Sequence, residues 1–254
     1  MATYNNIPVV LSYVTTTFML IFLLSVTNAI ASEDENTTLN TQSLLHPLES
    51  YQLDLGKDID PTKLTFKLSF TWPKGYCKTK GSGCEKATNL PDHFTIHGLW
   101  PIYRAKCTDS TEKFSVDLVK DLRGRLDQNW PDLKNYGNPS KYGTFWDHEW
   151  VAHGKKCALY TVKGYFRRSL NLYDASNVLR LLQQAGNPTN VEGVKKAFPG
   201  RTPTVFCKDG SDGKYYFFQL EFCLDRYEAF ENCPEPSRPD KTHCTPGKEF
   251  SYGA

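Results

Sequence analysis

Polar and apolar residues alternate in a few short segments of the chain, and these segments predict the strands of a sheet. Residues 64–72 have the period of a half-buried strand, and residues 93–100 form a second candidate. Residues 214–223 predict a third strand, which is rich in aromatic side chains. Pro73 and Pro101 follow the first two segments, so we expect both strands to end at these prolines.

Hydrophobic residues spaced three and four apart predict helices between the strands. Within residues 114–130 apolar side chains recur at every fourth position, and Ser115 is suited to cap this helix. Further helices are expected over residues 145–152, 165–185 and 191–198. No linker separates two cores, so we predict one α+β domain over residues 51–254, ending in a proline-rich loop and tail.

The N-terminal segment has the features of a secretory signal peptide. Residues 1–31 contain no Asp, Glu, Lys or Arg, and an apolar run of secretory length is followed by Ala29-Ile30-Ala31, a small-x-small cleavage pattern. The run is short for a membrane span. We expect cleavage after Ala31, no membrane association afterwards, and a flexible tail over residues 32–50. Asn36 begins an N-x-T sequon in that tail and is a candidate glycosylation site.

Charge and cysteine content narrow the class of protein. The formal net charge is +2 and charged residues make up 23% of the 254 residues, which argues against nucleic-acid binding through charge alone. Eight cysteines, an even number in an exported chain, predict disulfides. Zinc-ribbon Cys-x-x-Cys pairs are absent from the sequence. Eight cysteines allow about 105 pairings, and spacing alone does not choose among them.

Histidines supply the candidate chemistry. His148 and His153 are five residues apart, which on a helix separates them by about 140° and does not fit the zincin motif. We therefore expect no metal and no other cofactor. Glu149 and His153 are four apart and share a helical face, where the carboxylate would orient the imidazole and raise its pKa. Such a pair suits a general base, although it also suits an ordinary surface contact.

His97 is a second candidate, on a different element. It stands in a predicted strand beside Gly98, where the absence of a side chain lets another group approach the backbone closely. Two histidines from separate elements are the minimum for concerted acid–base catalysis near neutral pH.

Two segments that contain these histidines carry a family resemblance. Residues 94–101 (Phe-Thr-Ile-His-Gly-Leu-Trp-Pro) and 145–154 (Phe-Trp-Asp-His-Glu-Trp-Val-Ala-His-Gly) resemble the two active-site segments of the T2 ribonuclease family. Residues 72–77 and 219–234 resemble its first and last strands, and the signal peptide with the cysteine pattern resembles the secreted plant branch. The resemblance implies an antiparallel sheet packed with several helices and stapled by the disulfides Cys77–Cys84, Cys107–Cys157, Cys207–Cys244 and Cys223–Cys233.

The resemblance also implies an activity, a metal-free endoribonuclease that acts on single-stranded RNA. His153 would take the proton from the ribose 2′-OH, and His97 would protonate the leaving 5′-oxygen to give a 2′,3′-cyclic phosphate. His148 would hold the phosphate and Glu149 would assist there, while Phe145 and Trp100 are candidates for binding the substrate. DNA lacks the 2′-OH nucleophile and is not an expected substrate. We expect a secreted monomer, with the vacuole or another endomembrane lumen as alternative destinations.

One position departs from the family pattern. Ala152 stands where the family carries a lysine, directly before the second catalytic histidine, and the following Gly154-Lys155-Lys156-Cys157 has one extra residue. By analogy with removal of an oxyanion donor, losing the cation lowers the rate about 10²–10³-fold. We expect Lys155 or Lys156 to compensate in part. The alternatives are a catalytically impaired storage, defence or binding protein, and a self-incompatibility cytotoxin.

Overall fold

The computed structural model describes residues 59–235 and 242–253. The predicted signal peptide, the polar tail and the Asn36 sequon lie outside the described residues. Within these ranges no helix is long and apolar enough to cross a membrane.

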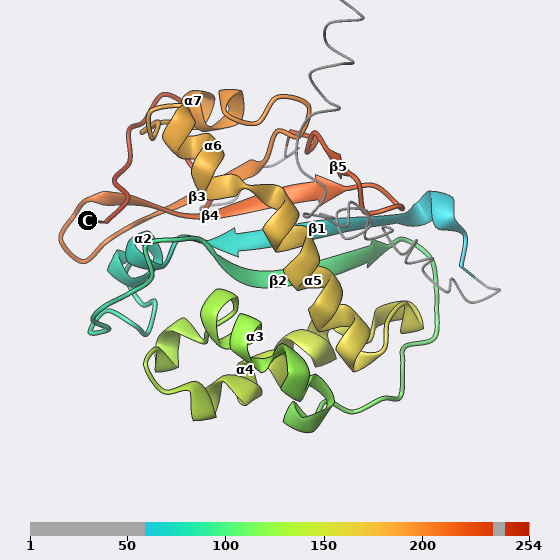
Figure 1. The fold of residues 1–254 in the computed structure, drawn as a ribbon. Coiled ribbons are helices and arrows are strands. Elements are labelled where there is room, and N and C mark those ends of the chain that lie inside the picture. Colours follow the sequence, from blue (N-terminus) through green and yellow to red (C-terminus); the bar gives the residue numbers. More distant parts are fainter. Residues whose placement is uncertain (1–58, 236–241, 254) are drawn as a thin grey trace, which may run out of the picture. The chain divides into compact units, whose positions relative to one another are not determined.

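One five-stranded antiparallel sheet forms the centre of the fold, as expected (Figure 1). The strand order is β2-β1-β4-β3, and β5 pairs with β4 outside this path. The three predicted strands are present, whereas β3 and β5 were not predicted, because burial does not alternate along β3 and β5 has only two residues. The strands are β1 (Leu64–Thr71), β2 (Thr95–Tyr103), β3 (Thr204–Asp209), β4 (Tyr215–Leu224) and β5 (Phe230–Glu231).

The two prolines behave differently from each other. Pro73 ends β1 as predicted and begins helix α2 (Pro73–Lys78) at its first turn, where its missing N–H costs nothing. The prediction that Pro101 ends the second strand is wrong, since β2 continues to Tyr103 and Pro101 pairs with Phe66. β2 lies at the edge of the sheet, where a residue without an N–H is tolerated.

Helices fill the middle of the chain, in more pieces than predicted. Ser115 does act as a cap, accepting a hydrogen bond from Asp117 N at 3.3 Å, but the segment it opens is a 3-10 helix that continues as α3. The long helix predicted over residues 165–185 is two helices, broken at Asn177, whose φ of +51° is left-handed. The main helices are η3 (Val116–Leu122), α3 (Arg123–Asn129), α4 (Tyr142–Glu149), α5 (Val162–Ser176), α6 (Val178–Gln184) and α7 (Val191–Lys196).

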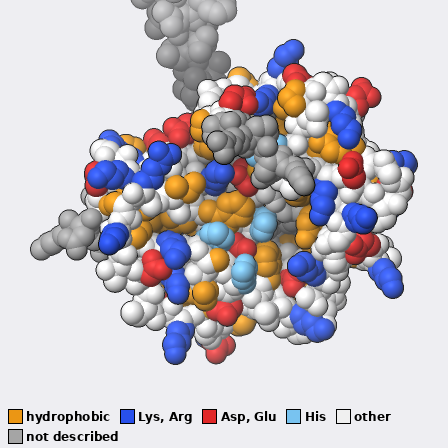
Figure 2. Space-filling view, turned by 180° about the vertical axis from the view of Figure 1, so that it is seen from behind, with side chains coloured by type: hydrophobic (Ala, Val, Ile, Leu, Met, Phe, Trp, Pro, Cys, Tyr) orange, Lys and Arg blue, Asp and Glu red, His pale blue; other side chains and the backbone are white. Residues whose placement is uncertain are grey.

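The sheet has an apolar face and a polar face. Every second residue of β1 is buried in the hydrophobic core, which α5 covers as it crosses the sheet (Figure 1). The alternate positions of β1, which include Lys67 and Thr71, project to the opposite face. Seen from that side, histidine side chains gather near the centre of the surface (Figure 2).

All four disulfides follow the expected pairing. They are Cys77–Cys84, Cys107–Cys157, Cys207–Cys244 and Cys223–Cys233. The second joins the loop after β2 to the segment after α4, across 50 residues. Trp150 Nε1 donates to Glu112 O at 2.9 Å in the same region. These links fix the helical segment with one candidate histidine beside the strand with the other.

Candidate active site

His97 occupies a β-bulge. In the pairing of β1 with β2, Ser69 is opposite Gly98 and Phe70 is opposite Ile96, so His97 is the extra residue. A bulge bends its strand and redirects the side chain that it carries. The backbone oxygen of His97 accepts a hydrogen bond from Trp130 Nε1 at 2.9 Å, which holds the bulge in place.

Gly98 makes room for a buried carboxyl over the bulge. Trp100 Nε1 donates to Glu149 Oε2 at 3.2 Å, and Glu149 Oε1 lies 3.9 Å from His97 Nε2. A Cβ atom on Gly98 would overlap both Glu149 and Trp100. The prediction that Gly98 permits a close approach is therefore confirmed, and the approaching groups are this carboxyl and this indole.

His153 is placed by a wide helical turn that follows α4. Residues Trp150–Gly154 form a π-helical turn, with an i to i+5 hydrogen bond from Lys155 N to Trp150 O at 3.0 Å. The predicted Glu149–His153 pair depended on residues four apart sharing one face of an α-helix, and the wider π-helical turn changes that spacing. The Glu149 carboxyl binds Trp100 instead.

Trp100 lies between the two candidate histidines. Its ring centroid is 5.2 Å from that of His97, edge on, and 5.2 Å from that of His153, at an interplanar angle of 33°. A single rigid indole thus spaces two imidazoles that are 56 residues apart in the sequence, while its N–H holds Glu149.

A pocket of about 450 Å³ opens beside this cluster. Four predicted site residues, His97, Phe145, His148 and Glu149, line it, whereas His153 and Trp100 are not among its lining residues. The Phe145 ring lies 6.3 Å from that of His97. The remaining lining residues are Thr71, Tyr76, Thr95, Ile96, Pro131, Asp132, Leu133, Lys134, Thr144 and Gln219.

Burial shifts the protonation of all three central groups. Burial raises the pKa of Glu149 to about 7, against the opposing hydrogen bond from Trp100. Burial, and then the positive charges of His97, His148 and Lys156, lower the pKa of His153 to about 4. The expectation that Glu149 raises the pKa of His153 is wrong, because desolvation outweighs any attraction. Surrounding protein also lowers the pKa of His97, although its bond with Gln219 acts in the opposite direction.

Several residues of the site were not predicted. Gln219 Oε1 lies 2.9 Å from His97 Nδ1, and Lys134 lines the pocket. The sequence placed Gln219 in a predicted strand, on the same face as Glu221, and in a segment that resembles the last strand of the family, but gave it no role at the site. Lys156, one of the two lysines expected to compensate for Ala152, binds Asp109 Oδ2 at 3.0 Å.

No group of three or more His, Cys, Asp and Glu side chains that could hold a metal ion is found among residues 59–235 and 242–253. What the described arrangement offers is proton transfer, from two imidazoles on separate elements beside a buried carboxyl.

A pocket with acid–base groups on one face of an α+β domain is typical of an enzyme that uses proton transfer. Comparison with known proteins then identifies the family. The sequence matches the family model described as the ribonuclease T2 family over residues 64–233, so the chain belongs to that family. It is 36% identical over 179 residues to the intracellular ribonuclease LX of Solanum lycopersicum, covering 64% of this chain and 74% of that protein. It is 34% identical over 191 residues to the extracellular ribonuclease LE of the same plant, covering 68% and 79%.

Solved structures agree with this assignment. RNase NT, crystallised in complex with 5′-AMP, has a TM-score of 0.61 and 30% identity, over 74% of this chain and 97% of that one. Human RNase T2 has a TM-score of 0.55 and 28% identity, over 67% of this chain and 90% of that one. Family membership supports an endoribonuclease.

The Gly98→Ala substitution is expected to disrupt the site while leaving the sheet in place. The new methyl group displaces the Glu149 carboxyl and the Trp100 indole, so we expect RNA cleavage to fall at least about tenfold. Gly124→Ala is the matched control, since a Cβ there meets nothing within 4 Å and lies in helix α3. That control should keep its activity and gain about 0.5–1 kcal/mol of stability in denaturant titrations. Equal activity of the two variants contradicts the close approach at Gly98.

Glu149→Gln tests the raised pKa through stability. Because the folded protein raises this pKa from 4.5 to about 7, the stabilisation by neutral Glu149 is present below pH 4.5 and is lost as pH rises through about 7. Glutamine keeps the neutral shape at every pH. We expect the variant to match wild type near pH 4 and to be more stable by about 3 kcal/mol at pH 8, measured by denaturant unfolding. A difference that does not change with pH would contradict the buried, neutral carboxyl.

Proposed function

We propose that this protein cleaves single-stranded RNA by metal-independent transesterification. His153 removes the proton from a ribose 2′-OH, and the 2′-oxygen attacks the adjacent phosphorus. The bond from phosphorus to the 5′-oxygen breaks as His97 gives that oxygen a proton. The products are a 2′,3′-cyclic phosphate and a free 5′-OH. The observation that carries the proposal is the pair of imidazoles on either side of Trp100, with Glu149 buried beside them.

The protonation of His153 supports its role as the base, whereas the role of His97 as the acid depends on the charge of the substrate. A pKa of about 4 leaves His153 neutral above that pH, as a base must be. His97 has to be protonated to act as the acid. Burial lowers the pKa of His97, and the Glu149 carboxyl, 3.9 Å from its Nε2, is neutral below about pH 7. The negative charge of a bound phosphodiester would therefore be the charge that favours the imidazolium.

The pocket supports a nucleotide substrate. His148 is assigned to the phosphate and Phe145 to stacking on a base, since both line the pocket with His97. Trp100 borders the reacting groups between the two imidazoles. The related RNase NT was crystallised with 5′-AMP, a ligand of this kind. DNA is excluded from the proposal because the reaction needs the 2′-OH.

Secretion is part of the proposal and rests on the sequence of residues 1–31. One relative is named as an extracellular enzyme and another as an intracellular one, so relatives occupy both locations. We propose that the mature chain is an exported monomer glycosylated at Asn36.

A catalytically impaired binding or storage protein is the second candidate. The observation that favours it is Ala152, within the π-helical turn, where the family has a lysine. The nearby Lys156 is engaged with Asp109, which leaves Lys155 as the more available substitute.

RNA cleavage by the purified, disulfide-intact protein is the direct test. We expect cleavage in the presence of EDTA, and its loss in both His97→Ala and His153→Ala. Activity needs neutral His153 and protonated His97. As the pH increases, kcat/KM should therefore rise through about pH 4 and then fall, and the midpoint of the fall should lie below the ordinary histidine pKa of 6.5. A cyclic phosphate end on the product identifies transesterification. An inactive wild-type protein would instead favour the impaired binding or storage function.

Replacing Lys155 and Lys156 together tests whether they compensate for Ala152. We expect Lys155→Ala/Lys156→Ala to lower kcat about tenfold or more, since less positive charge then faces the phosphate in the transition state. Lys163→Ala is the control, because that lysine pairs with Asp121 on the surface. Unchanged cleavage in the double variant would refute the compensation.

A further inference from the structure

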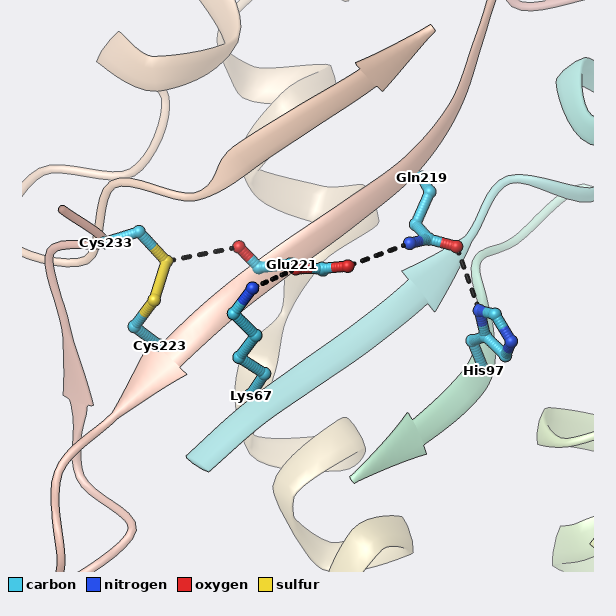
Figure 3. A network of polar contacts seen from close by, with 6 residues as sticks. All are labelled: Lys67, His97, Gln219, Glu221, Cys223 and Cys233. Atoms are coloured by element: carbon cyan, nitrogen blue, oxygen red, sulfur yellow. Dashed lines mark hydrogen bonds and ion pairs between the residues drawn. A yellow bond between two sulfur atoms is a disulfide. The ribbon is translucent and has the colours of Figure 1, made fainter. Parts of the chain in front are cut away.

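A chain of hydrogen bonds crosses three neighbouring strands and ends on His97 (Figure 3). Lys67 Nζ, from β1, lies 2.9 Å from Glu221 Oε2, and Gln219 Nε2 donates to Glu221 Oε1 at 3.2 Å. Gln219 Oε1 in turn lies 2.9 Å from His97 Nδ1. Glu221 and Gln219 belong to β4 and are only 5% and 8% exposed. The chain therefore links a buried carboxylate to the imidazole through one amide.

Donor and acceptor rules fix the direction of this chain. An amide nitrogen only donates and an amide oxygen only accepts. With the Gln219 nitrogen turned to the Glu221 carboxylate, its oxygen faces His97 and requires a hydrogen on Nδ1. The flipped amide would set its oxygen against the carboxylate, which is two acceptors facing each other. The ion pair with Lys67 holds the Glu221 carboxylate in place as an acceptor, and so disfavours that flip.

We propose that Gln219, oriented by the Glu221–Lys67 pair, is a positioning residue that keeps the neutral His97 ring protonated on Nδ1 and leaves Nε2 as the nitrogen that exchanges protons with the substrate. Nε2 is the nitrogen on the side of Glu149, 3.9 Å from Oε1.

The proposal rests on the proposed function for its catalytic meaning. When the His97 imidazolium gives its Nε2 proton to the leaving 5′-oxygen, the neutral ring that remains is already the Nδ1–H tautomer that Gln219 binds. No proton has to move between the two ring nitrogens. In the other neutral tautomer, Nε2 carries the hydrogen. That nitrogen could then not accept a proton from the substrate when the reaction runs in reverse.

Charged and titratable groups approach His97 from several elements, and a pH profile reflects all of them. They are Glu149 and His148 from α4, His153 from the π-helical turn, Lys134 from η4 (Leu133–Asn135), and Glu221 from β4. The test therefore reads the ring nitrogens directly, and uses the pH profile only as a second measurement.

Nitrogen NMR of the intact protein, labelled with ¹⁵N in its histidine rings, distinguishes the two neutral forms. At pH 8 we expect wild-type His97 to carry its hydrogen on Nδ1. In Gln219→Leu the acceptor for His97 Nδ1–H is absent. In Glu221→Gln the Gln219 side-chain amide is free to flip. Both variants should therefore show an increased population of the Nε2–H tautomer. Lys63→Met is the control, since it breaks the exposed Lys63–Asp60 pair outside the chain and should leave the tautomer unchanged.

Kinetics provide the second readout and a rescue. Both network variants should lower kcat at least about tenfold with KM changed less than about twofold, as expected for loss of proton-transfer geometry. Gln219→Glu keeps an acceptor on Nδ1, so it should keep the tautomer and much of the activity. Its negative charge should move the alkaline limb of the pH profile up by about one unit.

The outcomes separate this proposal from the proposed function. A wild-type His97 with its hydrogen on Nε2, or a tautomer unaffected in Gln219→Leu, overturns the positioning role whatever the activity. A wild-type Nδ1–H ring that responds to both network variants supports the positioning role, and if such a protein does not cleave RNA, it is the proposed function that fails.

Discussion

The hydrogen bond between Trp100 and Glu149 over the bare backbone of Gly98 is the contact on which the rest of the site depends. It brings a carboxyl from α4 onto β2, and the same indole spaces His97 from His153. The bulge in β2 makes this possible, because it leaves His97 as an extra, unpaired residue beside Gly98 while the strand pairing continues on either side. Backbone geometry, more than the choice of polar residues, thus sets the distances between the candidate groups.

Burial of Glu149 has an electrostatic consequence for its neighbours. A carboxyl with a pKa near 7 is neutral in acid and charged in base, so it attracts protonated His97 only as the pH approaches neutrality. Gln219 offers a contact that does not change in this way, since its amide oxygen accepts at every pH. The two partners of the ring therefore have different roles. The amide holds orientation constant, and the carboxyl varies the charge next to Nε2.

The main elements of the fold could be predicted from the sequence, and the fine geometry could not. Alternation located β1, β2 and β4 because each has one face in the core, and the family resemblance implied the disulfides that the structure contains. The bulge at His97 and the π-helical turn before Lys155 each shift the register by one residue, which no periodic pattern encodes. Gln219 acquires its role only through pairing across strands that are far apart in the sequence.

Ala152 has two opposite effects on the electrostatics of the site. In the proposed mechanism, the absence of a lysine beside His153 leaves less positive charge to attract the phosphate and to stabilise the transition state. Yet burial, and then the positive charges near His153, already lower its pKa to about 4, and another cation would lower it further, making the proposed base weaker still. In the proposed mechanism, Ala152 therefore costs transition-state stabilisation while it limits the loss of basicity at His153. The negative charge of a bound phosphodiester would raise the pKa of the imidazoles around it, and would so offset part of the lowering at His153 and at His97.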